Sequence, residues 1–282
     1  MPPAANVRAW VAQEAGIQIL REVASRCAEA GIPLLPVKGI VTSRLLYADV
    51  AERPITDVDI RIRARDLPRF RNAAASAGWP CSRVARTYRN LTYEFGLLSL
   101  DVEACVGPPG LCAMEIEAML DRSERCEIEP GVMVSIPEVH DHAVVLTVNA
   151  FKDKIVTATP WALADLERIV MHPTFRCDDF VDRVCQSRIT TLTWIVAEWM
   201  ASSRGIGAWG VVRAAVEARG HVRWGYAKLF RRLMVDEDSA QMPLRLLARV
   251  AADSGGMQLE AIVRAAAWTG EMWLREGRGR SH

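Results

Sequence analysis

Residues 34–62 read LLPVKGIVTSRLLYADVAERPITDVDIRI, and they carry most of the information about fold and function. It begins with a short apolar run that stops at Lys38-Gly39, and an amphipathic segment follows the glycine. The last six residues alternate, with Val58, Ile60 and Ile62 on one parity and Asp57, Asp59 and Arg61 on the other. A period of two residues is typical of a β-strand with one apolar face. The stretch therefore predicts a strand, a glycine turn that opens a helix, and a second strand with an acidic face.

Asp57 and Asp59 lie side by side on the polar face of the second predicted strand, about 7 Å apart along it. Two like charges held this close raise each other's pKa unless a cation lies between them. Mg²⁺ prefers oxygen ligands and would relieve the repulsion, and Mn²⁺ is the alternative ion. A short acidic motif alone is more often solvated surface, so the metal site depends on the residues around it.

The order of these motifs resembles a known superfamily. A strand, a glycine turn opening a helix and a strand bearing Asp-x-Asp are similar to the nucleotidyltransferases that include DNA polymerase beta. More closely, Lys-Gly, a tyrosine in the following helix and Arg-x-x-x-Asp-x-Asp resemble a bacterial family of mostly uncharacterised nucleotidyltransferases. The resemblance implies transfer of a nucleoside monophosphate from a nucleoside triphosphate, with release of pyrophosphate. It leaves open whether the acceptor is a small molecule, a peptide or protein, or an RNA end.

The superfamily holds its metal ions with three carboxylates on neighbouring strands, and Asp57 and Asp59 match the first two. The resemblance places the third on a later antiparallel strand. Residues 98–106, LSLDVEACV, alternate like a strand and offer Asp101 as the best match, with Glu103 on the same parity as the fallback. We expect Asp57, Asp59 and Asp101 to be the metal ligands and the catalytic residues. Asp101 is also the candidate base toward an acceptor hydroxyl.

Four residues near the glycine turn are the candidates for binding the triphosphate: Lys38, Gly39, Ser43 and Arg53. A lysine at such a turn acts as a mobile point charge on phosphate. An arginine four residues before the acidic motif can clamp phosphate or orient the carboxylates. A glycine that opens a helix lets the backbone amides and the helix dipole face an anion.

Two features of the resemblance leave alternatives. Ile40 stands where the wider superfamily has a second small residue, so the hydroxyl of Thr42 or Ser43 would have to replace it. Superfamily members also bring a lysine from the later, helical half onto the phosphates. Lys152 and Lys154 both match that role by position, and we take Lys154 as the candidate.

The order of predicted elements gives the fold class α+β. Residues 1–136 are expected to form a nucleotidyltransferase-type mixed sheet flanked by helices, and residues 137–282 an all-helical domain, because strand patterns disappear after Pro137. Apolar spacing predicts helices over residues 112–122, 139–151, 161–171, 180–200, 209–218, 226–234, 243–252 and 258–275.

Composition narrows the possible partners and location. The chain has 282 residues and a formal net charge of +1, so it has no overall basic field for holding a long nucleic acid. Its seven cysteines are irregularly spaced and include no CxxC pair, which indicates reduced thiols rather than structural zinc or disulfides. We find no signal peptide and no apolar run long enough for a bilayer. These features favour a cytoplasmic protein with no membrane partner.

Two other functions compete with an active transferase. Ile40 leaves open a binding or regulatory module that kept the fold and lost the chemistry, although the three carboxylates disfavour it. The other is a toxin-like nucleotidyltransferase that modifies tRNA, a setting that the family resemblance allows.

Overall fold

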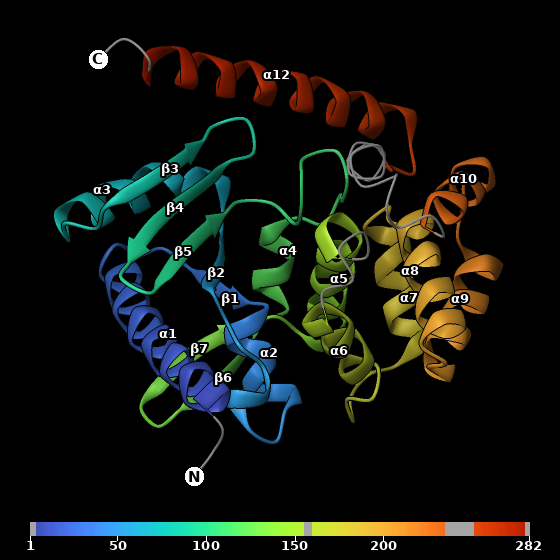
Figure 1. Ribbon diagram of the computed structural model, residues 1–282, viewed down its shortest axis with the longest axis horizontal. Helices are drawn as coiled ribbons and strands as arrows, with labels where there is room; N and C mark the ends of the chain where they lie inside the picture. Colours follow the sequence, from blue (N-terminus) through green and yellow to red (C-terminus); the bar gives the residue numbers. More distant parts are fainter. Residues whose placement is uncertain (1–3, 155–159, 235–250, 280–282) are drawn as a thin grey trace.

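The computed structural model describes residues 4–154, 160–234 and 251–279 of the chain (Figure 1). The first half is mixed, with helices packed around strands. Its elements are α1 (Ala4–Glu29), β1 (Leu34–Val37), α2 (Gly39–Leu46), η1 (Val50–Glu52), β2 (Asp57–Ile62), η2 (Ala64–Asp66), α3 (Leu67–Ser76), β3 (Cys81–Ala85), β4 (Asn90–Phe95), β5 (Leu98–Glu103), α4 (Ile116–Asp121), β6 (Glu124–Glu129) and β7 (Val132–Ile136).

The main sheet has five strands in the order β1-β2-β5-β4-β3, and β6 and β7 form a separate hairpin. β5 runs parallel to β2 and pairs Asp101 with Asp59, whereas the other neighbours in the sheet are antiparallel. The expectation of an antiparallel strand for the third carboxylate was therefore wrong. After α3 crosses over, the chain reverses twice, from β3 to β4 and from β4 to β5, and this restores the direction of β2.

The apolar face of the sheet builds one of the two cores. Val58, Ile60 and Ile62 of β2 are fully buried, in one cluster with Leu20 of α1 and Phe70 of α3. This confirms the predicted alternation. The opposite face is not open surface, because Asp59 and Arg61 are 3% and 2% exposed. Acidic side chains on this face are therefore covered by protein, and their charge has to be balanced locally.

All described elements after Ile136 are helical. They are α5 (Val139–Asn149), the π-helical turn η3 (Ala150–Lys154), α6 (Pro160–Ile169), α7 (Cys177–Gln186), α8 (Thr190–Ser203), α9 (Gly207–Arg219), α10 (Trp224–Met234) and α12 (Gly255–Gly279). The mixed α+β sheet followed by helices confirms the predicted fold class. Leu35 and Val37 of β1 share a buried cluster with Phe151, Leu166 and Trp209, so the helices pack directly against the edge of the sheet. None of the helices in the described ranges has the length and apolar character needed to cross a membrane.

Three predicted helices differ from the described elements or lie outside them. The single helix over residues 180–200 is two helices, because Arg188 adopts φ 53° and ends the first. The helix over residues 112–122 begins only at Ile116, and the amide of Ala113 donates to the Ser187 carbonyl. The helix expected over residues 243–252 lies almost wholly outside the described residues.

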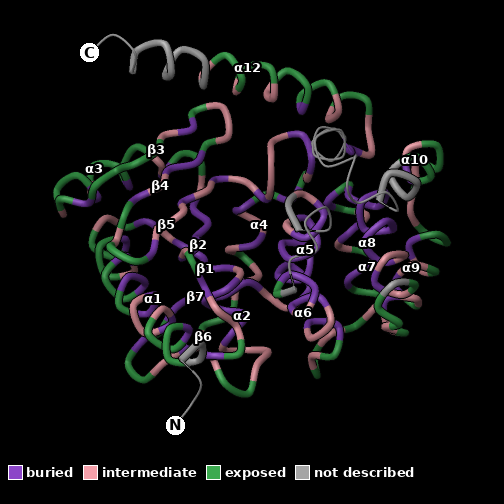
Figure 2. The backbone as a smooth tube through the Cα atoms, viewed as in Figure 1, coloured by how far each residue is buried: buried purple, intermediate pink, exposed green. Residues whose placement is uncertain are grey.

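The last helix, α12, lies across the β3–β4 hairpin, far from it in sequence (Figure 1). Its Glu271 carboxylate accepts hydrogen bonds from the Thr87 hydroxyl at 3.0 Å and from the Arg86 amide at 3.3 Å in the hairpin turn. Its first turns approach Gly110 so closely that a Cβ there would lie 2.5 Å from the Met257 carbonyl oxygen. Figure 2 shows that much of α12 is nevertheless exposed, whereas α5 and α8 are mainly buried. The helix is thus held to the sheet at a few specific points.

Candidate active site

Three carboxylates converge where β2 and β5 run side by side. The register places Asp59 opposite Asp101, and Asp57 lies two residues upstream on the same face. One ligand oxygen of each of the three residues lies within 4.8 Å of the other two. The structure therefore brings together the three side chains that the sequence singled out. An all-oxygen donor set of this kind fits Mg²⁺ or Mn²⁺.

The carboxylates repel one another and are partly removed from water. Burial, followed by the charges of Asp59 and Asp101, raises the pKa of Asp57 to about 6. Burial also raises the pKa of Asp101, although the Thr92 hydroxyl donates a hydrogen bond of 2.7 Å to it. A cation at this position would remove the penalty for keeping both groups ionised.

This repulsion predicts how Asp57 affects stability. A carboxyl whose folded pKa is raised stabilises the fold below its unfolded pKa and loses that contribution as the pH rises through about 6. Without divalent cations, Asp57→Asn should therefore raise the free energy of unfolding at pH 8 by about 1–2 kcal/mol, after discounting for partial exposure. The difference should disappear near pH 4, and Mg²⁺ should raise the melting temperature of the wild type more than that of the variant. Thermal unfolding at both pH values measures this, and a variant less stable than the wild type at pH 8 would contradict it.

Lys38 and Gly39 form the turn between β1 and α2. The Lys38 ammonium lies 2.6 Å from Asp59 Oδ1. The backbone of Lys38 has φ 55° and ψ −137°. Burial lowers the pKa of Lys38, but Asp59 and Glu103 outweigh this and raise it to about 12, so the side chain stays charged. A Cβ on Gly39 would lie 2.7 Å from Ile55 Cγ2, so packing also requires glycine there.

Arg53 is held in place by Asp165 of α6, a contact across 112 residues of sequence. Its Nη2 lies 2.8 Å from Asp165 Oδ2, and the Tyr47 hydroxyl donates to the same carboxylate at 2.7 Å. Asp165 is only 1% exposed on its side chain. Arg53 still lines the cleft together with Asp57, so Asp165 fixes the orientation of the Arg53 guanidinium at the site. No local sequence pattern marks the pairing of Arg53 with Asp165.

Ser43 does not belong to the site. It is fully buried, and its hydroxyl donates to Gln13 Oε1 at 3.1 Å on α1. Its proposed role in substrate binding is therefore not supported, because α2 turns this position away from the cleft. Thr42 is also fully buried, 3.4 Å from His142 Nε2. Ile40 belongs to the core packed against α1, so it leaves the cleft unobstructed.

Glu103, the fallback for the third carboxylate, has a different partner. It lies 2.7 Å from Arg61 Nη2 and accepts a hydrogen bond from Asn90. Burial alone would raise the pKa of Glu103, but Arg61 and Lys38 outweigh it and hold the pKa at about 2. Glu103 thus balances a buried guanidinium, and Asp101 completes the carboxylate cluster.

The carboxylates open into a cleft with a volume of about 470 Å³. The residues that line it beside them include Lys38, Gly39 and Arg53 and, from positions that sequence reasoning missed, Thr56, Arg83, Asn149 and Trp161. Lys152 of η3 also lines this cleft. The backbone of Lys154 ends the same turn, but its side chain lies outside the described residues. Thr56 directly precedes β2, whereas Arg83 comes from the far edge of the sheet and Asn149 and Trp161 come from helices, where no local motif marks them.

Comparison with known proteins identifies a family, and it also finds similar solved structures. A family model described as uncharacterised nucleotidyltransferase matches residues 5–202. The solution structure of the antibiotic-resistance factor ANT(2'')-Ia is similar with 14% identity and a TM-score of 0.43, over 77% of this chain and 95% of that one. No curated protein matches. The family match spans most of the chain and all of the carboxylate cluster, and the chain therefore belongs to this family of uncharacterised nucleotidyltransferases.

Proposed function

We propose that the chain is a metal-dependent enzyme that moves a nucleoside monophosphate group from a nucleoside triphosphate to an acceptor and releases pyrophosphate. The convergence of Asp57, Asp59 and Asp101 within 4.8 Å of one another carries this proposal. Asp57, Asp59 and Asp101 would hold Mg²⁺ or Mn²⁺, which neutralises triphosphate charge and lowers the pKa of an acceptor hydroxyl when bound.

The residues at the start of α2 would bind the triphosphate. The helix N-terminus opens at Gly39 in the same cleft as the carboxylates, and its dipole favours an anion. Lys38 and Arg53 add two positive charges to this end of the cleft. Lys38 contacts Asp59 at 2.6 Å, so its charge lies directly beside the carboxylate cluster.

The reaction needs one bond formed, one broken and one proton moved. An acceptor oxygen attacks the α-phosphorus, and the bond from that phosphorus to the bridging oxygen breaks, so pyrophosphate leaves with the electron pair. Asp101 is the candidate base, because burial raises its pKa and the hydrogen bond that the Thr92 hydroxyl donates to Oδ1 orients the carboxylate. The acceptor proton would pass to this carboxylate and then to water.

Pyrophosphate release tests the activity. Each of the four common triphosphates is incubated with the protein, Mg²⁺ and a cell extract fraction, and pyrophosphate is measured against protein-free controls. We expect release with at least one triphosphate, and a loss of at least about 100-fold when a chelator removes the metal. Release that is unchanged by the chelator would show that the activity needs no metal ion. No release with any triphosphate or fraction would favour the inactive binding module.

We also propose two domains, residues 1–136 and 137–282, and a cytoplasmic location. The last described strand ends at Ile136, which supports the division. All seven cysteines are free, which favours a reducing compartment.

A further inference from the structure

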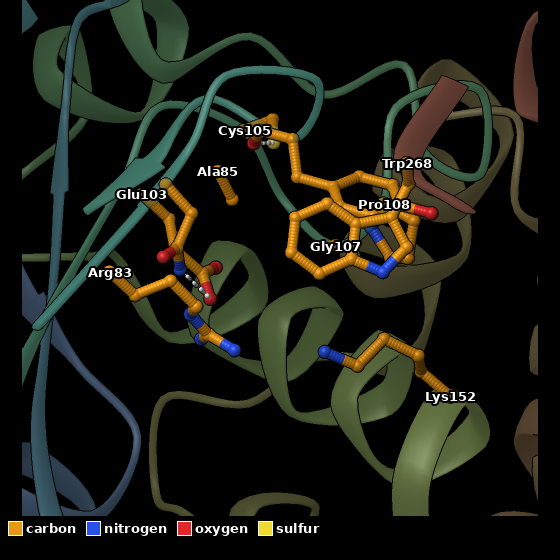
Figure 3. Close-up of a pocket in the computed structure, with 10 residues that line it drawn as sticks. Arg83, Ala85, Glu103, Cys105, Gly107, Pro108, Lys152 and Trp268 are labelled. Atoms are coloured by element: carbon orange, nitrogen blue, oxygen red, sulfur yellow. Dashed lines mark hydrogen bonds between the residues drawn. The ribbon is translucent and has the colours of Figure 1, made fainter. Parts of the chain in front are cut away.

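A second pocket, partly lined by β3, adjoins the cleft (Figure 3). Its volume is about 210 Å³, and it shares Arg83, Glu103 and Lys152 with the cleft. Pockets for whole ligands are usually about 300–1,000 Å³. This one therefore suits one end of a small molecule whose remainder extends toward the carboxylates.

The sheet order separates the two ends of the site. Lys38 and Gly39 follow β1 at one edge, the carboxylates stand on β2 and β5, and Arg83 stands on β3 at the other edge. An acceptor has to reach the α-phosphorus from the side opposite the leaving pyrophosphate. With the triphosphate at α2, that approach runs from the second pocket.

Aromatic and apolar groups form one wall of this pocket. The rings of Tyr88 and Trp268 have their centroids 5.2 Å apart and are tilted by 54°. Trp268 lies beside Pro108 and faces the pocket (Figure 3). The anchor Glu271 is one helical turn away on α12 and is bonded to the hairpin turn that carries Tyr88. The indole is thus held over the pocket, where it offers a flat surface for a ring.

Positive charge dominates the opposite side. Arg83 and Lys152 reach from β3 and η3 toward the space between them (Figure 3). Glu103 is the carboxylate beside them, and its charge is already balanced by Arg61 at 2.7 Å. Two cations around one space favour an anionic group of the ligand.

We propose that this pocket binds the acceptor, and that the acceptor is a small molecule with a planar ring, an anionic group and a hydroxyl. The ring would lie on Trp268 and Tyr88, and the anionic group between Arg83 and Lys152. The hydroxyl would extend toward Asp101, form the new oxygen–phosphorus bond and give its proton to that carboxylate as pyrophosphate leaves. This assignment rests on the proposed nucleotidyl transfer.

Three probes test the pocket without knowledge of the natural acceptor: phenyl phosphate, phenol and inorganic phosphate. The protein is first saturated with Mg²⁺ and a triphosphate analogue that carries a methylene group between the α- and β-phosphorus, so that the α2 end is filled. Binding of each probe is then measured by calorimetry. We expect phenyl phosphate to bind at least 10-fold more tightly than either part alone. Trp268→Ala and Arg83→Gln should each weaken it at least 5-fold.

Trp10→Ala and Arg71→Gln are the matched controls, because both residues are exposed on distant helices, and both should leave binding unchanged. Arg83 lies on an exposed position of an edge strand, so Arg83→Gln remains informative if Trp268→Ala fails to fold. The assignment would be overturned if phenyl phosphate bound no better than phosphate, or if it bound both pocket variants as tightly as the wild type. Binding of the triphosphate analogue is measured separately. If the analogue does not bind, the result counts against the transferase proposal but does not change the result for the pocket.

Discussion

Replacing Asp57 and Asp59 together by asparagine should reduce nucleotidyl transfer at least about 1,000-fold. The two side chains supply two of the three converging carboxylates, and amides lack the charge that would hold a divalent cation. Labelled product from the active triphosphate measures the loss. If the double variant retains more than a tenth of wild-type transfer, these two carboxylates are not needed for the reaction.

The control for this variant makes the same change in charge elsewhere. Asp178 and Asp182 are both exposed, and both pair with Arg219 on the helical side of the molecule. Replacing this pair by asparagine should leave transfer within about twofold of the wild type. Far-ultraviolet circular dichroism and thermal unfolding of both double variants show whether loss of the Lys38 partner has affected the fold.

Asp165→Ala should lower the free energy of unfolding by about 3–5 kcal/mol. The change leaves the guanidinium of Arg53 and the hydroxyl of Tyr47 without their shared acceptor inside the protein. It should also reduce transfer, because Arg53 loses the contact that directs it beside Asp57. Denaturant unfolding measures the stability, and Tyr47→Phe should cost only about 1 kcal/mol, since it removes a single neutral donor.

Asp178→Ala is the matched control for Asp165→Ala. Each aspartate lies 2.8 Å from an arginine Nη2, but the Asp178 side chain is 86% exposed and the Asp165 side chain 1%. Water screens the exposed pair, so its removal should cost about 0–1 kcal/mol. Equal costs for the two substitutions would mean that burial does not determine the strength of the Arg53 contact.

Local patterns predicted the parts of the site that depend on neighbouring residues. The period of two in residues 57–62 correctly assigned Val58 to the core and Asp59 to the opposite face. Asp101 could be selected because its strand has the same alternation. The direction of that strand could not be predicted. Alternation is the same in parallel and antiparallel strands, and the direction depends on how many times the chain reverses before the strand.

Contacts between distant residues were beyond the reach of sequence patterns. Ser43 was a reasonable hydroxyl for phosphate by position, but its orientation depends on Gln13, a partner on another helix. The pairing of Arg53 with Asp165 depends on how α6 docks against α2. The break at Arg188 has no glycine or proline to mark it, since a non-glycine residue adopts the left-handed conformation there.

The family match ends at residue 202, whereas Trp268 enters the second pocket from α12. If that pocket selects the acceptor, the wall that α12 contributes can change without any change in the segment that carries the carboxylates. In this chain α12 would then be the place where a change of acceptor could arise while the nucleotide-handling residues stay the same. Exchange of that helix between relatives would be a direct route to redirecting the modification.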